Sequence, residues 1–249
     1  KKVMKIFISQ IFFKENDFDF DFISKYFDGI ELRGDRLIKD YDIFNFDLFK
    51  NKKFNLLIHS TFENIDISSL NEWERVKSIR EVEKSIPIAK KLNIKYAIVH
   101  PSSKVKDENA RMENLKKSLE SLIEIKETGK IFGVEVLVEN LPLGYLCSYE
   151  KEISFFIDNG FDLCFDFGHS MLTFKEPFEI VEKLKEHIKV LHLHSNDRNA
   201  DQHNFLKQDF EIYKNILNII SKDTTVVIET KDDKKNIVLE FLSEYSNKK

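Results

Sequence analysis

Residues 190–203 read VLHLHSNDRNADQH, an apolar run that ends in histidines and carboxylates. The chain has only seven histidines, and three of them fall within these fourteen residues. His192 and His194 are two positions apart, so on an extended strand their side chains point to the same face. Asp201 and His203 repeat that spacing a few residues later. The stretch therefore predicts a buried β-strand that delivers potential ligands to its carboxyl end.

Similar short runs recur along the chain and predict seven further strands, at 5–9, 29–33, 55–60, 96–101, 134–140, 162–168 and 225–230. Most are near-continuously apolar, which is typical of parallel strands buried on both faces. Amphipathic helical stretches lie between them, at 69–93, 108–130, 148–160, 176–188 and 209–222. Eight βα units predict an α/β fold, a single (β/α)₈ TIM barrel domain over residues 1–249. An open doubly wound sheet is the alternative, but no GxGxxG follows the first strand.

Three residues predict where these helices start, divide or end. Pro87 is expected to kink or divide the stretch 69–93, because proline cannot donate a helical hydrogen bond. Gly129 is expected to cap the carboxyl end of the helix in 108–130. Ser148 is a candidate amino-terminal cap for the helix in 148–160.

Composition limits the classes of protein to consider. The chain is 42% hydrophobic and 33% charged with a net charge of −4, which indicates a globular protein and argues against a non-specific nucleic-acid coat. No apolar run approaches the roughly 18 residues needed to span a bilayer, so no membrane partner is expected. The first residues predict a strand rather than a signal peptide. Two cysteines, Cys147 and Cys164, form no disulfide framework, which predicts a cytoplasmic location.

Nine potential metal ligands follow the ends of the predicted strands. In a barrel, these ends meet on the face where active sites are built. Each residue alone is more often a hydrogen-bonded core or capping residue. A concentrated set of carboxylates, however, would repel unless cations lay between them. Zinc takes about four ligands, so nine ligands predict two or three ions. The set is His59, His100, Glu139, Asp166, His169, His194, Asp201, His203 and Glu229.

The chain resembles the xylose isomerase-like barrels, a superfamily that includes endonuclease IV and sugar epimerases. The resemblance rests on short motifs at the strand ends, and the ligand pattern is most similar to that of endonuclease IV. The matching segments are IHS (58–60), VHPSS (99–103), VENLP (138–142), CFDFGHS (164–170), HSND (194–197), DQH (201–203) and VIET (227–230).

The resemblance implies a role for each of the nine ligands. It implies that Glu139 bridges two ions, with His59 and His100 on one side of the bridge. It implies that Asp166, His194 and Glu229 hold the other ion of that pair. It assigns the third ion to the remaining ligands, which are His169, Asp201 and His203. The set Glu139, Asp166, His194 and Glu229 also resembles the single-metal quartet of the sugar epimerases.

The ligand pattern is compatible with two functions. The first is a metal-dependent phosphoester hydrolase with two or three Zn²⁺ ions, in which the ions position a water for in-line attack. The second is a sugar or sugar-phosphate isomerase or epimerase with one Mn²⁺, Mg²⁺ or Co²⁺, in which Glu139 and Glu229 move the proton. In either case we expect a small-molecule partner, a phosphoester or a sugar. The sequence leaves the oligomeric state open.

Residues around the ligands refine the expected substrate. Arg198 and Phe62 are candidates for substrate binding, and His192 for a supporting position behind the metal ligands. Endonuclease IV inserts a wedge into DNA after the third strand, where this chain has Phe62 and Glu63. A carboxylate there would meet phosphate repulsion and a desolvation cost, so duplex DNA is not the favoured substrate.

Overall fold

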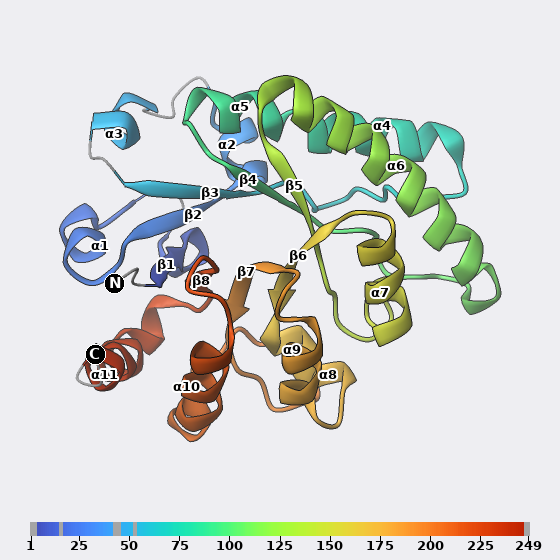
Figure 1. Ribbon diagram of the computed structural model, residues 1–249. Coiled ribbons are helices and arrows are strands. Elements are labelled where there is room, and N and C mark those ends of the chain that lie inside the picture. The colour runs from blue at the N-terminus through green and yellow to red at the C-terminus, as the bar shows by residue number, and fades with distance from the viewer. Residues whose placement is uncertain (1–3, 15–16, 42–45, 52–53, 247–249) are drawn as a thin grey trace.

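The computed structural model describes residues 4–14, 17–41, 46–51 and 54–246, and it contains a closed barrel of parallel strands (Figure 1). Each strand pairs with its sequence neighbours, and β8 returns to pair with β1, so the sheet has no free edge. The predicted TIM barrel is confirmed. The strands are β1 (Lys5–Ser9), β2 (Gly29–Arg33), β3 (Asn55–His59), β4 (Tyr96–Val99), β5 (Glu135–Glu139), β6 (Asp162–Asp166), β7 (Ile188–Leu193) and β8 (Thr225–Ile228).

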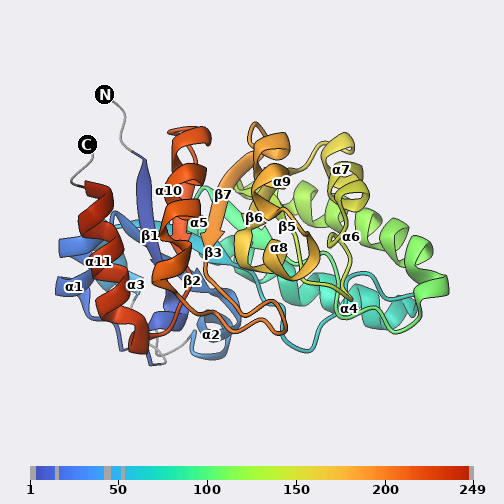
Figure 2. The ribbon, with the colours of Figure 1, turned by 90° about the horizontal axis from the view of Figure 1, so that it is seen from below.

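Helices lie outside the strands, as the views in Figures 1 and 2 show. The longest, α6, pairs with α4 along one side of the barrel. The helices are α1 (Phe20–Tyr26), α2 (Gly34–Lys39), α3 (Phe46–Asn51), α4 (Glu72–Glu83), α5 (Ser85–Lys91), α6 (Arg111–Phe132), α7 (Glu150–Asp158), α8 (Phe167–Thr173), α9 (Pro177–Leu184), α10 (Phe210–Ile219) and α11 (Lys235–Ser246). Within the described residues, no helix is both long and apolar enough to cross a bilayer.

The helix boundaries confirm one detail of the sequence analysis and correct two. The stretch 69–93 divides at Lys84, as expected from Pro87, which lies in the first turn of α5 and lacks the N–H that would bond to the Glu83 carbonyl in a continuous helix. Helix α7 starts at Glu150 with Tyr149, not Ser148, at its amino cap position. Helix α6 continues past Gly129 to Phe132, and its carboxyl cap is Gly133, whose φ of +70° is the left-handed conformation that glycine adopts without strain.

The interior of the barrel is divided between an apolar half and a polar half. The apolar part is a cluster of inward-facing side chains in the middle of the strands, consisting of Phe7, Leu57, Ile98, Leu137, Cys164, Val190 and Val227. A larger cluster fills the space between the strands and the helices. The candidate metal ligands lie at the carboxyl ends of the strands, so apolar packing supports them from below.

Gly129 has a packing role that its position in a helix does not suggest. An added Cβ would lie 2.6 Å from the Val134 carbonyl oxygen and 3.1 Å from Val136 Cγ2, at the start of β5. In an ordinary helix interior, a Gly→Ala substitution stabilises the folded protein by about 1 kcal/mol. Here we predict that Gly129→Ala destabilises the protein by about 1–3 kcal/mol, because the chain must shift to relieve the overlap.

Thermal and urea unfolding followed by circular dichroism measure this effect. Ile131→Ala, at an exposed position two residues along the same helix, is the matched control, with an expected change within about 0.5 kcal/mol. A Gly129→Ala variant more stable than the wild type would show that the approach of α6 to β5 is looser than described.

Candidate metal centre

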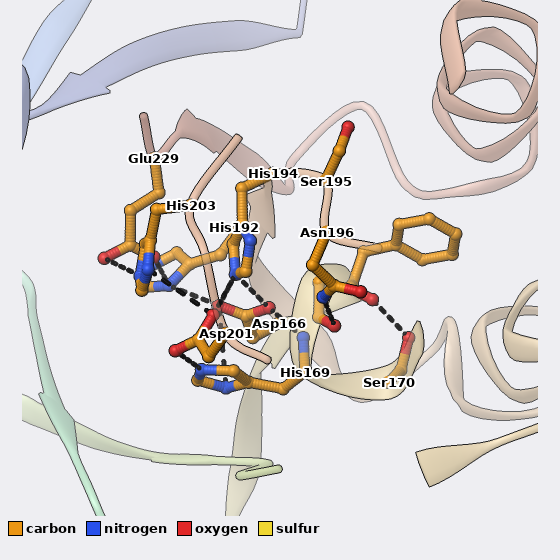
Figure 3. Close-up of polar contacts among 12 residues, drawn as sticks. Asp166, His169, Ser170, His192, His194, Ser195, Asn196, Asp201, His203 and Glu229 are labelled. Carbon is orange, nitrogen blue, oxygen red and sulfur yellow. Dashed lines mark hydrogen bonds and ion pairs between the residues drawn. The ribbon is translucent and has the colours of Figure 1, made fainter. Parts of the chain in front are cut away.

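All nine predicted ligands lie at the carboxyl end of the barrel. His59, Glu139 and Asp166 are the last residues of β3, β5 and β6. His100, His194 and Glu229 directly follow β4, β7 and β8. The other three come from α8 and from the loop after β7, which an antiparallel bridge between Ser195 and Asn204 closes. Figure 3 shows six of these side chains, together with His192, converging on one centre.

The first group of ligands surrounds Glu139. Its Oε2 lies 2.9 Å from His59 Nε2 and 3.2 Å from His100 Nε2. The other nitrogen of His59 lies 3.0 Å from the Ser60 carbonyl oxygen, to which it can donate. A backbone partner of this kind fixes which nitrogen of a ligating histidine faces the metal. These three residues could hold one ion.

The second group surrounds Asp166 and extends into the loop. His194 Nε2 lies 3.0 Å from Asp166 Oδ1, and His169 Nδ1 lies 3.6 Å from Asp166 Oδ2. His169 Nε2 lies 3.3 Å from Asp201 Oδ2, and His203 Nδ1 lies 3.4 Å from Asp201 Oδ1. Two overlapping ligand triads result, one with Asp166 and one with Asp201, and both include His194.

Local structure holds this second group in place. Asp166 is the amino-terminal cap of α8, and its side chain accepts a hydrogen bond from the His169 backbone at 2.7 Å. Asn140 joins β5 to β6 because its amide accepts from Asp166 N at 2.7 Å and donates to Asp166 O at 2.9 Å. At Gly168, an added Cβ would lie only 2.0 Å from the His194 ring. The ring therefore packs directly on the glycine backbone, and no larger residue fits.

The structure adds Glu31, which the sequence analysis missed. Glu31 lies in the middle of β2, is fully buried, and has Oε2 2.8 Å from His192 Nε2. A carboxylate within the apolar run GIELR was the available signal, but it does not stand at the strand end where ligands were sought. His192, expected in a supporting position, contacts the carboxylates directly: its Nδ1 lies 2.9 Å from Glu229 Oε2.

Mutual neutralisation governs the charges of the cluster. Burial alone would raise the pKa of Glu139, but His100 and His192 hold it well below its ordinary value. Burial would also raise the pKa of Glu229, but His192 and His203 hold it well below its ordinary value. Conversely, against the cost of burial, Asp166 and Asp201 raise the pKa of His169 to about 10. The pKa of His203 is raised to about 9 against the same cost, chiefly by Glu229. Without a metal ion, protons on His169, His192 and His203, whose pKa values are all raised, supply positive charge beside the carboxylates.

The donor set fits a divalent cation. Among the described residues, Nδ1 of His192 and Nδ1 of His194 are buried without a hydrogen-bond partner, although each ring has its other nitrogen beside a carboxylate. Buried polar atoms are rarely left unsatisfied in native structures. Imidazole nitrogens and carboxylate oxygens are ligands of zinc and of other divalent ions. The buried clusters of histidine, glutamate and aspartate thus have the character of divalent metal sites.

Two cavities open on the cluster, with Phe62 between them. One, of about 480 Å³, is lined by His100, His169 and Asp201, and the other, of about 360 Å³, by Glu31, His59, His203 and Glu229. Phe62 lines both cavities.

The two candidate substrate-binding residues differ in position. The Phe62 ring stacks on His100 with centroids 4.7 Å apart, and the Arg33 guanidinium lies 4.9 Å from the centroid of the same ring. The structure does not bring Arg198 to the cluster. It is exposed, lines neither of these two cavities, and donates weakly to the Lys175 carbonyl.

Solved structures share this fold over nearly their whole length. A D-tagatose 3-epimerase-like protein is 22% identical, with a TM-score of 0.80 over 98% of this chain and 99% of its own. The TTHB071 protein from Thermus thermophilus, soaked with zinc chloride, is 19% identical, with a TM-score of 0.77 over 99% of both chains. The 3-keto-D-glucoside 4-epimerase YcjR from E. coli is 17% identical, with a TM-score of 0.76 over 98% and 99%. At these identities the likeness concerns the fold.

Two curated relatives, both from Methanocaldococcus jannaschii, match part of the sequence. The uncharacterized protein MJ1614 is 28% identical over 64% of this chain and 63% of its own length. The uncharacterized protein MJ1311 is 30% identical over 59% of this chain and 54% of its own. The chain thus matches less than two thirds of the length of either relative.

A sequence profile decides the family. The profile of the xylose isomerase-like TIM barrel matches residues 20–245, from α1 to α11, and includes every strand except β1. Together with the closed parallel barrel and the ligands at its carboxyl end, this match assigns the chain: it belongs to the xylose isomerase-like TIM barrel family.

Proposed function

We propose that this protein is a metal-dependent isomerase or epimerase that acts on a small sugar or sugar phosphate. The observation that carries the proposal is the grouping of Glu139, Asp166 and Glu229 around one buried position. An oxygen of each lies within 3.6 Å of His192 Nδ1. Family membership supports an enzyme of this class, and two of the solved structures with the same fold are named as a sugar epimerase or as epimerase-like.

The residues fit such a reaction as follows. A divalent ion held by these carboxylates would polarise a substrate carbonyl and acidify the neighbouring C–H bond. Glu139 and Glu229 come from β5 and β8, and their depressed pKa values keep them ionised and able to accept a proton. One carboxylate takes the proton from the carbon, and the electron pair moves into the adjacent carbonyl. A water molecule held by the other carboxylate then protonates the opposite face of the carbon as the electron pair returns, and the hydroxide left behind takes the proton from the first carboxyl group, so that both residues are ionised again.

The surroundings of the cluster also suit a small substrate. Phe62 lies against His59 and His100, where it shields the ligands instead of projecting as a wedge. Glu63 accepts a hydrogen bond from Arg33 at 2.7 Å and leaves a carboxylate at the mouth of the site. Its charge is paired with that guanidinium, and Lys104, Lys106 and Lys231 also line the two cavities, so the mouth carries charges of both signs. The position of Phe62, against the ligands and not projecting as a wedge, is what makes nucleic acid a less favoured partner.

A second candidate, the multi-zinc phosphoester hydrolase, was the first expectation from the ligand pattern. The comparisons support the isomerase better. One observation still favours the hydrolase: His59, His100, His169, Asp201 and His203 form further ligand groups that a single-metal enzyme does not need. The nine roles assigned by resemblance to endonuclease IV accordingly remain predictions.

Metal stoichiometry separates the two candidates. We predict that sugar isomerisation reaches its plateau at about one equivalent of Mn²⁺, Mg²⁺, Co²⁺ or Zn²⁺ per chain, since one ion suffices to polarise the carbonyl. The measurement is a titration of metal-free protein, assayed in parallel on ketoses, ketose phosphates and small phosphodiesters. Phosphodiester hydrolysis that appears only at two or three equivalents, with no sugar turnover, would favour the hydrolase.

The two proposed proton carriers give a separate prediction. Glu139→Gln and Glu229→Gln should each lower isomerisation at least about 100-fold, because an amide cannot accept the proton. Proton NMR in D₂O measures exchange at the carbon beside the ketose carbonyl. Glu120→Gln, on the surface of α6 and paired with Lys117, is the matched control and should leave exchange unchanged. Exchange at the wild-type rate in either site variant would exclude that residue as a proton carrier.

A further inference from the structure

The larger of the two cavities on the cluster has two lysines in its wall. This cavity of about 480 Å³ is lined by the candidate ligands His100 and His169 and also by Lys104 and Lys106. The lysines lie a few residues beyond His100, in the loop that follows β4, and both are exposed. One small molecule in the cavity can therefore contact the metal centre and the lysine side chains together.

Neighbouring structure holds this loop and one of its lysines in place. Val105 lies between the two lysines in sequence, packs against the core, and donates from its backbone N to Gly144 O at 2.8 Å. A Cβ added at Gly144 would lie 3.4 Å from Lys104 Cε and 3.9 Å from Lys104 Cγ. The aliphatic part of Lys104 therefore lies along the Gly144 backbone, which restricts where its ammonium group can go.

The ammonium groups of the two lysines have no acidic partner. Among the described residues, neither group makes a hydrogen bond or an ion pair. The acids that follow them in sequence bind elsewhere: Asp107 Oδ1 accepts from Asn109 N at 2.9 Å, and Glu108 pairs with Arg111 at 3.2 Å. By contrast, several other exposed lysines pair with a glutamate one helical turn away, as Lys130 does.

Two carboxylates that line the same cavity are also engaged elsewhere. Asp66 Oδ1 accepts from the backbone N of Ser68 at 3.0 Å and of Ser103 at 3.2 Å, which ties the loop after β3 to the loop after β4. Glu74 Oε2 accepts from Ser69 Oγ at 2.6 Å. These acids serve the loops and form no ion pair with either lysine, so the lysines can bind an anionic ligand.

A phosphate monoester suits this part of the cavity better than a carboxylate does. At pH 7 it carries a charge of about −1.5 to −2, which two ammonium groups can neutralise. Lysine is a common phosphate ligand and acts as a point charge. Phe62, Leu141 and Pro142 line the same cavity and supply apolar surface for the carbons of a sugar.

The smaller cavity offers fewer unpaired cations. Its Arg33 is bound to Asp35 at 2.6 Å and to Glu63 at 2.7 Å. Its Arg36 donates to backbone carbonyl groups. Lys231 is then the remaining lysine or arginine that lines this cavity. A doubly charged group is therefore matched better by the larger cavity.

We propose that the substrate is a ketose phosphate, whose carbonyl lies at the metal centre and whose phosphate, on the terminal carbon far from the carbonyl, is bound by Lys104 and Lys106. This inference rests on the proposed function, because it takes the substrate to be a sugar. It narrows the substrate to a phosphorylated sugar and assigns the two residues that recognise the phosphate.

Binding to the metal-loaded protein, measured by isothermal titration calorimetry, tests the proposal. The probes are D-fructose, D-xylulose and D-ribulose, each beside its terminal phosphate. For at least one pair, the wild type should bind the phosphate at least about 10-fold more tightly, as charge-assisted contacts provide. The double variant Lys104→Met/Lys106→Met should lose this preference and bind the parent ketose as the wild type does, because methionine removes the charge and keeps an unbranched apolar side chain. In turnover, it should raise KM for the phosphate and leave kcat nearly unchanged.

Lys116→Met is the matched control, since this exposed lysine of α6 lines neither cavity, and it should keep the preference. Three outcomes would overturn the proposal. The wild type could bind no phosphate more tightly than its parent ketose. The double variant could keep the preference, which would place the phosphate on the metal. Lys231→Met alone could abolish it, which would place the phosphate in the smaller cavity.

The failure of this proposal is distinguishable from that of the proposed function. If the phosphates bind through the two lysines but no ketose exchanges its proton, the phosphate site stands and the isomerase falls. If ketoses are isomerised equally well with and without the phosphate, in the wild type and in the double variant, the phosphate site falls and the isomerase stands.

Discussion

The carboxylates of Glu139, Asp166 and Glu229 impose the constraint on which the rest of this site depends. They are buried at one end of the barrel and all approach the same imidazole nitrogen. Two such charges 4–7 Å apart repel by roughly 2–4 kcal/mol at an effective dielectric constant of about 20. The fold can hold three of them only if positive charge is always present, supplied by protonated imidazoles or by a metal ion. A site built this way exchanges protons for metal, because a histidine must be neutral to ligate.

The barrel makes this arrangement possible by giving its two halves different chemistry. Apolar side chains such as Phe7, Leu137 and Val227 fill the barrel interior at mid-strand, below the ligands, and supply the packing. The ligands then project from strand ends that this packing and the hydrogen-bonded registers already fix. Where the ladder stops, Asn140 continues it by bonding both backbone groups of Asp166. The ligands are therefore held by regular structure, which suits a centre that must keep a fixed geometry.

The sequence predicts the architecture well because six of the eight strands, β3 to β8, carry two signals: an apolar run and a potential metal ligand at its end. The segment 162–168 shows both signals, and the structure has β6 there with Asp166 as its last residue. Helix ends are less predictable because two glycines near one end can have different roles: Gly133 caps α6, whereas the close approach of α6 to the start of β5 accounts for Gly129.

The candidate site, too, is predictable from the sequence only in part. The convergence of the nine ligands follows from topology, and the sequence predicts it. How they pair does not follow, because it depends on ring orientation and on the stagger of neighbouring strands. Asp166 stands in register with His192, not with His194. Glu31 escapes prediction because a buried carboxylate in mid-strand has no spacing signature. Arg198 lies in an exposed loop outside the two cavities, so its role in substrate binding stays a prediction.

The central claim is that the buried carboxylates form a metal site. The proposed isomerase activity requires that site. Anomalous X-ray diffraction from crystals of the whole chain grown with Zn²⁺ or Mn²⁺ tests it most directly. We predict an anomalous peak between Glu139, Asp166 and Glu229, about 2.0–2.2 Å from an oxygen of each. A map with no peak there at saturating metal, or with peaks only among His59, His100, Asp201 and His203, would contradict the claim.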